Sequence, residues 1–152
     1  MDVHEFLEMP KKIDTMIRNK WAEVEMWREI ASSTTGKITG DRVQSSRNPY
    51  KMEGAADTYM NIEQEITDDI AELIQKKKDV ISVIEQLPAA RYDLLHKIYI
   101  QFMTLKAAAI ACGMSYTSAT TEHGRALQQV QKILNERENI LKDYEMRGTY
   151  ND

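Results

Sequence analysis

Few residues of this chain have the spacing of catalytic or metal-binding groups. The three histidines, His4, His96 and His123, have no cysteine or carboxylate partner at metal-ligand spacing. Cys112 is the only cysteine, and it lies in the small-residue run AAAIAC without a basic neighbour that would activate a thiol. The chain has no glycine-rich phosphate loop, nucleophile elbow or pair of catalytic carboxylates. We therefore expect no enzyme activity, no cofactor and no metal.

The residues between Thr104 and Leu127 have a different kind of chemistry. Thr104 can cap a short helix that closes at Gly113, and Ser115 can cap the helix that follows. A short helix, a glycine turn and a capped second helix form the plan of a helix-turn-helix, whose second helix enters the major groove of DNA. The sequence therefore predicts a DNA-binding unit in this segment.

Helical spacing assigns the residues of the second helix to two faces. The inner face is predicted to hold Ala119, Ala126, Leu127 and Val130. The candidate DNA-binding residues are Ser115, Tyr116, Thr117, Ser118, Thr120, Thr121, Glu122 and Arg125. Hydroxyl groups can bond base edges or phosphates, Glu122 could accept a hydrogen bond from cytosine, and Arg125 could reach guanine or a phosphate. Arg91, Lys106 and His123 are the candidate phosphate contacts.

The stretch from Leu87 to Leu134 resembles the fourth conserved region of bacterial sigma factors. The matching positions are Leu87-Pro88, Arg91, Leu95, Tyr99, Thr104-Leu105, Ala109, Gly113-Met114-Ser115, His123 and Arg125-Ala126-Leu127. With a KKID helix start and an RVQSS loop upstream, the whole chain is similar to the ArpU/RinA type of phage and prophage regulators. The resemblance implies control of transcription through DNA, with RNA polymerase as a further partner. The stretch departs from the sigma pattern at Ala108, at Ile110 and at Thr120-Thr121-Glu122.

Two long helices are predicted before this segment. Apolar residues at three- and four-residue steps run from Lys11 to about Ser33, namely Ile13, Ile17, Trp21, Val24, Trp27 and Ala31. Residues 34–53 lack any period and predict a mobile loop. A near-heptad run then extends from about Gly54 to Leu87, with Lys77 at its one polar position. We expect these helices to form a hairpin.

The remaining elements complete an all-α fold. Pro88 opens a new unit. Leu94, Leu95, Ile98, Tyr99 and Phe102 predict one helix, and the helix capped by Ser115 is expected to reach about Leu141. The predicted domains are a coiled-coil-like hairpin at 1–87, a sigma-like helix-turn-helix module at 88–141 and a flexible tail at 142–152.

The charge distribution favours the same DNA-binding segment. The 152-residue chain has a net charge of −4, and residues 1–87 hold 12 basic and 17 acidic residues. Residues 88–134, by contrast, hold five basic and two acidic residues. Because DNA affinity depends on the field at the contact face, the acidic total does not exclude a DNA-binding protein.

Partners and location follow from the same observations. No apolar run is long enough to span a membrane, and the acidic start MDVHEFLE is unlike a signal peptide, so we expect a protein of the bacterial cytoplasm. The expected partner is double-stranded DNA, and the long heptad-like seam favours a homodimer through the long helices. Two alternatives remain open. One is a small terminase-like DNA-packaging protein, and the other is a module that binds RNA polymerase without touching DNA. The operator, the direction of regulation and the oligomeric state do not follow from the sequence.

Overall fold

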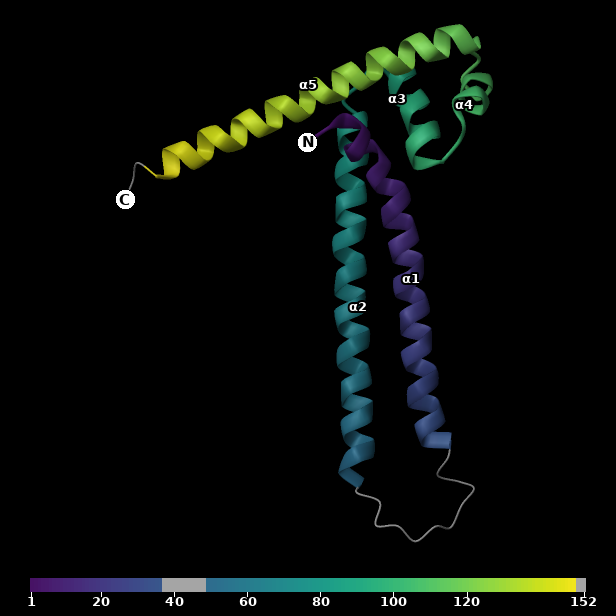
Figure 1. Ribbon diagram of the computed structural model, residues 1–152, viewed down its shortest axis with the longest axis vertical. Helices are drawn as coiled ribbons and strands as arrows, with labels where there is room; N and C mark the ends of the chain where they lie inside the picture. The colour runs from purple at the N-terminus through teal and green to yellow at the C-terminus, as the bar shows by residue number, and fades with distance from the viewer. Residues whose placement is uncertain (37–48, 150–152) are drawn as a thin grey trace. The chain divides into compact units, whose positions relative to one another are not determined.

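The protein is all-α, as predicted. The computed structural model describes residues 1–36 and 49–149, with side chains for 1–32 and 57–149. The described helices are α1 (Val3–Gly36), α2 (Pro49–Ile84), α3 (Ala89–Leu95), the π-helical turn η1 (His96–Ile100), α4 (Leu105–Ala111) and α5 (Tyr116–Gly148) (Figure 1). Most of the predicted loop, residues 37–48, lies outside the described residues. α2 begins before the predicted Gly54, and α5 continues for two turns past the predicted end at Leu141.

Two compact units divide the chain. One consists of Met1–Lys12 and Lys76–Asp152, here called the core unit, and the other is Ile13–Gln75, here called the hairpin unit. The predicted boundary at residue 88 therefore separates segments that the structure groups together. Both long helices pass through the division without a break, so it does not coincide with the end of a helix.

In the hairpin unit, α1 and α2 run side by side in opposite directions (Figure 1). Val24, Ile66 and Ile70 are buried together, and Ile17 and Ile62 pack against them. The Lys20 Nζ donates to Asp69 Oδ2 at 3.3 Å, and Arg28 donates to Tyr59 and Glu63, each at 3.2 Å. These contacts join the two helices through an apolar seam with polar pairs at its edges.

Part of the predicted apolar face of α1 is not buried. Trp21 is 51% exposed and Trp27 is 40% exposed, whereas Ile13 and Val24 are buried. The two tryptophans lie at the edges of a stripe that is wider than one partner helix can cover. Ile66, Ile70, Leu73, Val80, Ile84 and Leu87, from the predicted heptad seam, are all buried within the single chain. The seam therefore gives no argument for a second copy.

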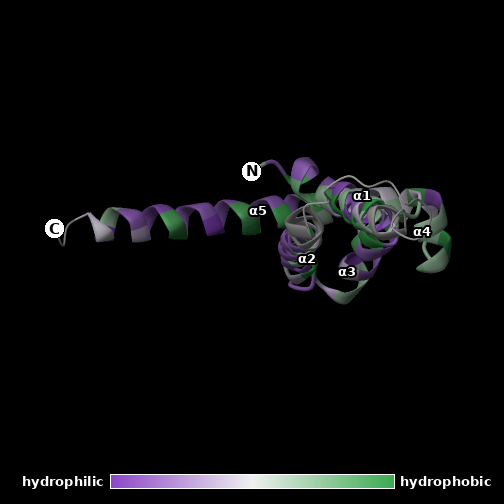
Figure 2. Ribbon diagram, turned by 90° about the horizontal axis from the view of Figure 1, so that it is seen from below, coloured by the Kyte–Doolittle hydropathy of each residue, from purple (hydrophilic) through white to green (hydrophobic). Residues whose placement is uncertain are grey.

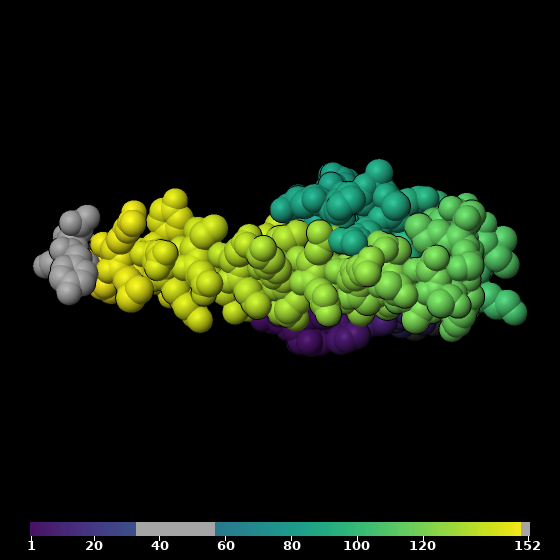
Figure 3. Space-filling model, turned by 90° about the horizontal axis from the view of Figure 1, so that it is seen from above, coloured from purple at the N-terminus to yellow at the C-terminus, as the bar shows by residue number. Residues whose placement is uncertain are grey.

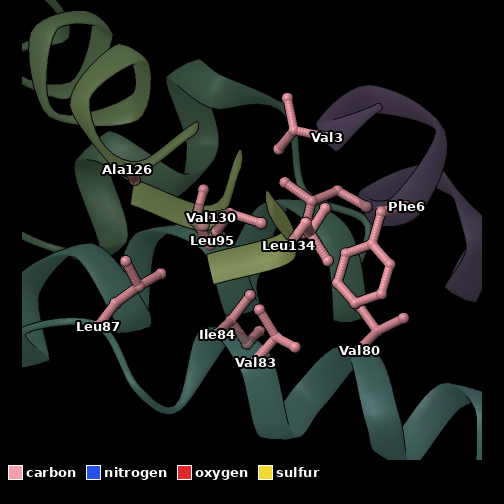
Figure 4. Packing of buried hydrophobic residues seen from close by; sticks show 11 residues of the cluster. Val3, Phe6, Val80, Val83, Ile84, Leu87, Leu95, Ala126, Val130 and Leu134 are labelled. Carbon is pink, nitrogen blue, oxygen red and sulfur yellow. The ribbon is translucent and has the colours of Figure 1, made fainter. Parts of the chain in front are cut away.

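The core unit is held together by one large apolar cluster, shown in Figure 4. Its buried members are Val3, Phe6, Leu7, Val80, Val83, Ile84, Leu87, Leu95, Ala126, Val130 and Leu134. They come from the first turns of α1, the last turns of α2, the segment that follows α2, α3 and α5 as far as Leu134. This cluster positions the start of α5.

The predicted helix through Leu94 and Phe102 is confirmed as far as Ile100 but not at Phe102. α3 ends at Leu95, η1 follows, and Phe102 has a φ of 60°. A residue with a positive φ cannot continue a right-handed helix, in which φ is about −63°. The chain turns at this point, and Thr104 then lies at the start of α4 as its N-cap.

Candidate nucleic-acid interface

The segment from Thr104 to Ser118 has the local geometry that the sequence predicts. The Thr104 hydroxyl oxygen accepts from the Ala107 N–H at 3.1 Å, which caps α4. Gly113 has a φ of 67°, in the left-handed region that glycine adopts at little cost. The Ser115 hydroxyl oxygen accepts from the Ser118 N–H at 3.1 Å and caps α5. Short-range chemistry thus fixes where each helix begins and how the turn between them runs.

Small residues hold α4 against α5. Ala108, Ala109 and Ala119 are buried together with Leu94 of α3, and their short side chains allow the helices to approach closely. Ala108, which departs from the sigma pattern, is fully buried. Ile110, the other departure on this helix, is 73% exposed. The outer faces of both helices are exposed, as at Ile110 of α4 and Tyr116 of α5.

Cys112 lies beside this alanine cluster and is half-buried. Its thiol donates to Asp93 Oδ2 at 3.4 Å. Burial raises the pKa of the thiol, and the neighbouring Asp93 carboxylate acts in the same direction. Because the reactive species is the thiolate, this environment disfavours a nucleophilic role for Cys112.

The two faces at the start of α5 separate as predicted. Ala119, Ala126 and Val130 are fully buried, and Leu127 packs against the same cluster. The outward face is exposed and consists of Tyr116, Thr117, Ser118, Thr120, Thr121 and Arg125. It is an amphipathic surface rich in hydroxyl groups, with one long cationic side chain near its end.

The hydroxyls of this face are preorganised by their own helix. The Thr120 hydroxyl donates to the Tyr116 carbonyl at 2.9 Å, and the Thr121 hydroxyl donates to the Thr117 carbonyl at 3.2 Å. Each oxygen keeps its acceptor lone pairs. The Ser115 hydroxyl oxygen already accepts the capping hydrogen bond, so we expect Ser115 to fix the start of α5 rather than to contact DNA directly.

Arg91 and Glu122, both predicted to contact DNA, are paired with each other. The Arg91 Nε donates to Glu122 Oε2 at 2.8 Å, and its Nη1 donates to Gln129 Oε1 at 2.8 Å. The hydrogen bond from Arg91 holds the pKa of Glu122 below its usual range, so the carboxylate stays charged and paired. Arg91 therefore braces α3 against α5, and Glu122 is less available to a base than the sequence predicts. Gln129 is a structural member of this network that the sequence did not reveal.

His123, predicted to contact a phosphate, points into the core unit instead. It is half-buried, its Nε2 is hydrogen-bonded to the Tyr99 hydroxyl at 2.8 Å, and the two rings stack with centroids 5.9 Å apart. Burial lowers the pKa of His123, with the charge of His4 acting in the same direction. Because a lowered pKa favours the neutral imidazole, the half-buried His123 is poorly placed to hold a phosphate by charge.

Lys106 of α4 lies beside the start of α5. Together with Thr104, Leu105 and Tyr116 it lines a surface hollow of about 450 Å³. The lysine is exposed, as is Arg125. Arg125 also donates to Glu122 Oε1 at 3.3 Å, a contact that is weak at an exposed site and can be exchanged for another acceptor. The structure thus brings a cation of α4 to the same surface as the hydroxyl face of α5.

The described residues hold neither a metal-binding cluster nor a membrane-spanning helix. Within 1–32 and 57–149, no three side chains of histidine, cysteine, aspartate or glutamate gather as a metal site would need. None of the helices described is both long enough and apolar enough to cross a membrane. Comparison with known protein families, with curated proteins and with solved structures found no match.

Proposed function

We propose that this protein binds double-stranded DNA through the outward face at the start of α5 and regulates transcription. The observation that carries the proposal is the exposed, capped start of α5, where Tyr116, Thr117, Ser118 and Thr121 face away from the core unit beside Lys106. Such a helix fits the major groove, where hydroxyls and methyl groups can read base edges.

The phosphate contacts proposed here are a smaller set than the sequence suggests. Lys106 precedes the turn and Arg125 lies on the third turn of α5, so the two cations flank the hydroxyl face. Free N–H groups of the first turn of α5 add a favourable position for a phosphate. Arg91 and Glu122 act behind this face, because their ion pair fixes α5 against α3. The resemblance to sigma factors extends the proposal to RNA polymerase as a second partner.

Selection of bound duplexes from a random pool at physiological salt tests the proposal. We expect one recurrent motif. On that duplex, Arg125→Ala should weaken binding about tenfold or more, as loss of one specific base or phosphate contact does. Lys78→Ala, an exposed cation on α2 of the same unit, is the matched control and should leave affinity within about twofold. Recovery of no motif, or equal losses in both variants, would refute the proposal.

Salt dependence tests the role of Lys106 separately. If its ammonium neutralises one phosphate, Lys106→Ala should reduce the slope of log affinity against log salt by about one while keeping the same preferred motif. An unchanged slope would mean that Lys106 does not touch the DNA backbone.

A further inference from the structure

The apolar stripe of α5 continues beyond the core that covers it. Ala126, Val130 and Leu134 are buried, and the three- and four-residue spacing then runs on to Ile140, Leu141 and Tyr144. These three are 54%, 63% and 70% exposed. Figure 2 shows hydrophobic positions repeating along α5 toward its C-terminal end. The second half of α5 has the apolar spacing of a buried helix, but in the described part of the chain no other element covers these three side chains.

The last hydrogen bonds and ion pairs between α5 and the rest of its unit are made by Arg137 and Glu138, just before Ile140. Arg137 donates to both carboxylate oxygens of Asp79, at 3.1 and 3.2 Å, and Glu138 pairs with the N-terminal amine. Among the residues described, those of α5 after Glu138 make no hydrogen bond or ion pair with another element. In Figure 3 the yellow end of α5 extends past the other segments of its unit. A short helix without packing is marginal in water, so this stretch gains from an apolar partner.

We propose that residues 137–148 of α5, here called the α5 extension, pair with the same segment of a second copy. Arg137, Ile140 and Tyr144 have the three- and four-residue spacing of a coiled-coil seam, with Leu141 beside it, and a second helix fits such a seam. The charge of this segment is compatible with self-association. Residues 137–148 hold three basic and three acidic residues, so the segment carries no net charge that would repel its own copy.

The two extensions pair in antiparallel orientation. The core unit lies against the same stripe at Val130 and Leu134. A parallel second copy would place its own α5 in that space, whereas an antiparallel copy leaves the two core units at opposite ends. With the two-fold axis near residues 142 and 143, Leu141 of one copy faces Tyr144 of the other. Glu136 then lies within about 3 Å, measured along the axis, of Arg147 in the other copy.

This contact is isologous and closes after two subunits. It predicts a dimer rather than the many-membered ring of a DNA-packaging protein. Self-association through α5 is independent of DNA binding. The mass of the protein is measured without DNA, so the two proposals can fail separately.

Analytical ultracentrifugation of the full chain at micromolar concentration is the test. The wild type should have a mass of about 35 kDa, twice the 17.6 kDa of the chain. Leu141→Glu should reduce the mass to one chain while far-UV circular dichroism retains a folded core unit. Met146→Glu is the matched control, because Met146 is 62% exposed in the same segment but lies on the other side of the helix. A monomeric wild type, a dimeric Leu141→Glu variant, or dissociation by Met146→Glu as well would overturn the proposal.

Charge reversal tests the antiparallel orientation. Glu136→Arg and Arg147→Glu should each raise the dimer dissociation constant about two- to fivefold, and the double variant should restore it. The two residues are 11 positions apart on one helix, about 16 Å, so rescue cannot come from a contact within one chain. Failure of the double variant to recover would exclude this orientation.

Discussion

Two glycines near the candidate interface should respond in opposite directions to the same substitution. Gly113 has a φ of 67° in the turn before α5, and a Cβ added there would meet nothing within 4 Å. Gly124 lies within α5, and a Cβ added there would also meet nothing within 4 Å. Since neither site has a steric clash, any difference between the two alanine variants reports the backbone conformation alone.

The magnitudes follow from that comparison. A left-handed alanine costs about 1–2 kcal/mol, and the stiffer unfolded chain offsets about 0.4–1 kcal/mol of this. Gly113→Ala should therefore lower the free energy of unfolding by about 1 kcal/mol. Gly124→Ala should raise it by about 0.8–1 kcal/mol, the difference in helix propensity between the two residues. Gly113→Asn should cost less than Gly113→Ala, because asparagine tolerates the left-handed region.

Urea denaturation followed by far-UV circular dichroism measures all three variants. The expected order of stability is Gly124→Ala, wild type, Gly113→Asn, Gly113→Ala. If Gly113→Ala were as stable as Gly124→Ala, the turn would not be left-handed, and the orientation argued here for the start of α5 would fail.

Three further changes test the packing and electrostatics of the core unit. Ser115→Ala should cost about 1 kcal/mol of stability in urea denaturation through loss of the cap on α5, and Ser115→Asp should restore it. Leu94→Ala should cost about 2–5 kcal/mol by leaving a cavity, whereas the same change at the exposed Ile110 should cost under about 0.5 kcal/mol in the same assay. Because burial lowers the pKa of His123, the unfolded state binds a proton first as pH falls. Stability should therefore decrease as pH falls below about 6.5, and His123→Gln should flatten this dependence in urea titrations; an equally steep decrease in that variant would assign it to other groups.

Local chemistry was the part of the site that could be predicted from the sequence. Thr104, Gly113 and Ser115 act through bonds and dihedral angles within a few residues, so their roles were evident from spacing alone. Burial of Ala119 and Ala126 followed from helical periodicity. The all-α class followed because apolar positions recur at helical steps on both sides of residues 34–53.

Contacts between distant residues could not be predicted in this way. Arg91 and Glu122 are 31 positions apart, and both looked like free DNA contacts until the fold brought them together. His123 looked solvent-exposed because nothing in the sequence places Tyr99 beside it. The turn at Phe102, whose φ is 60°, ends a pattern whose apolar spacing is still helical at that position.

Photo-crosslinking from one position on α5 tests the central claim most directly. A photoreactive phenylalanine analogue at Thr121, in the middle of the outward face, should form a covalent adduct with the selected duplex upon irradiation. The same analogue at Glu85, an exposed residue near the end of α2, is the control and should not. Duplex binding without an adduct at position 121, or equal adducts at both positions, would contradict the account.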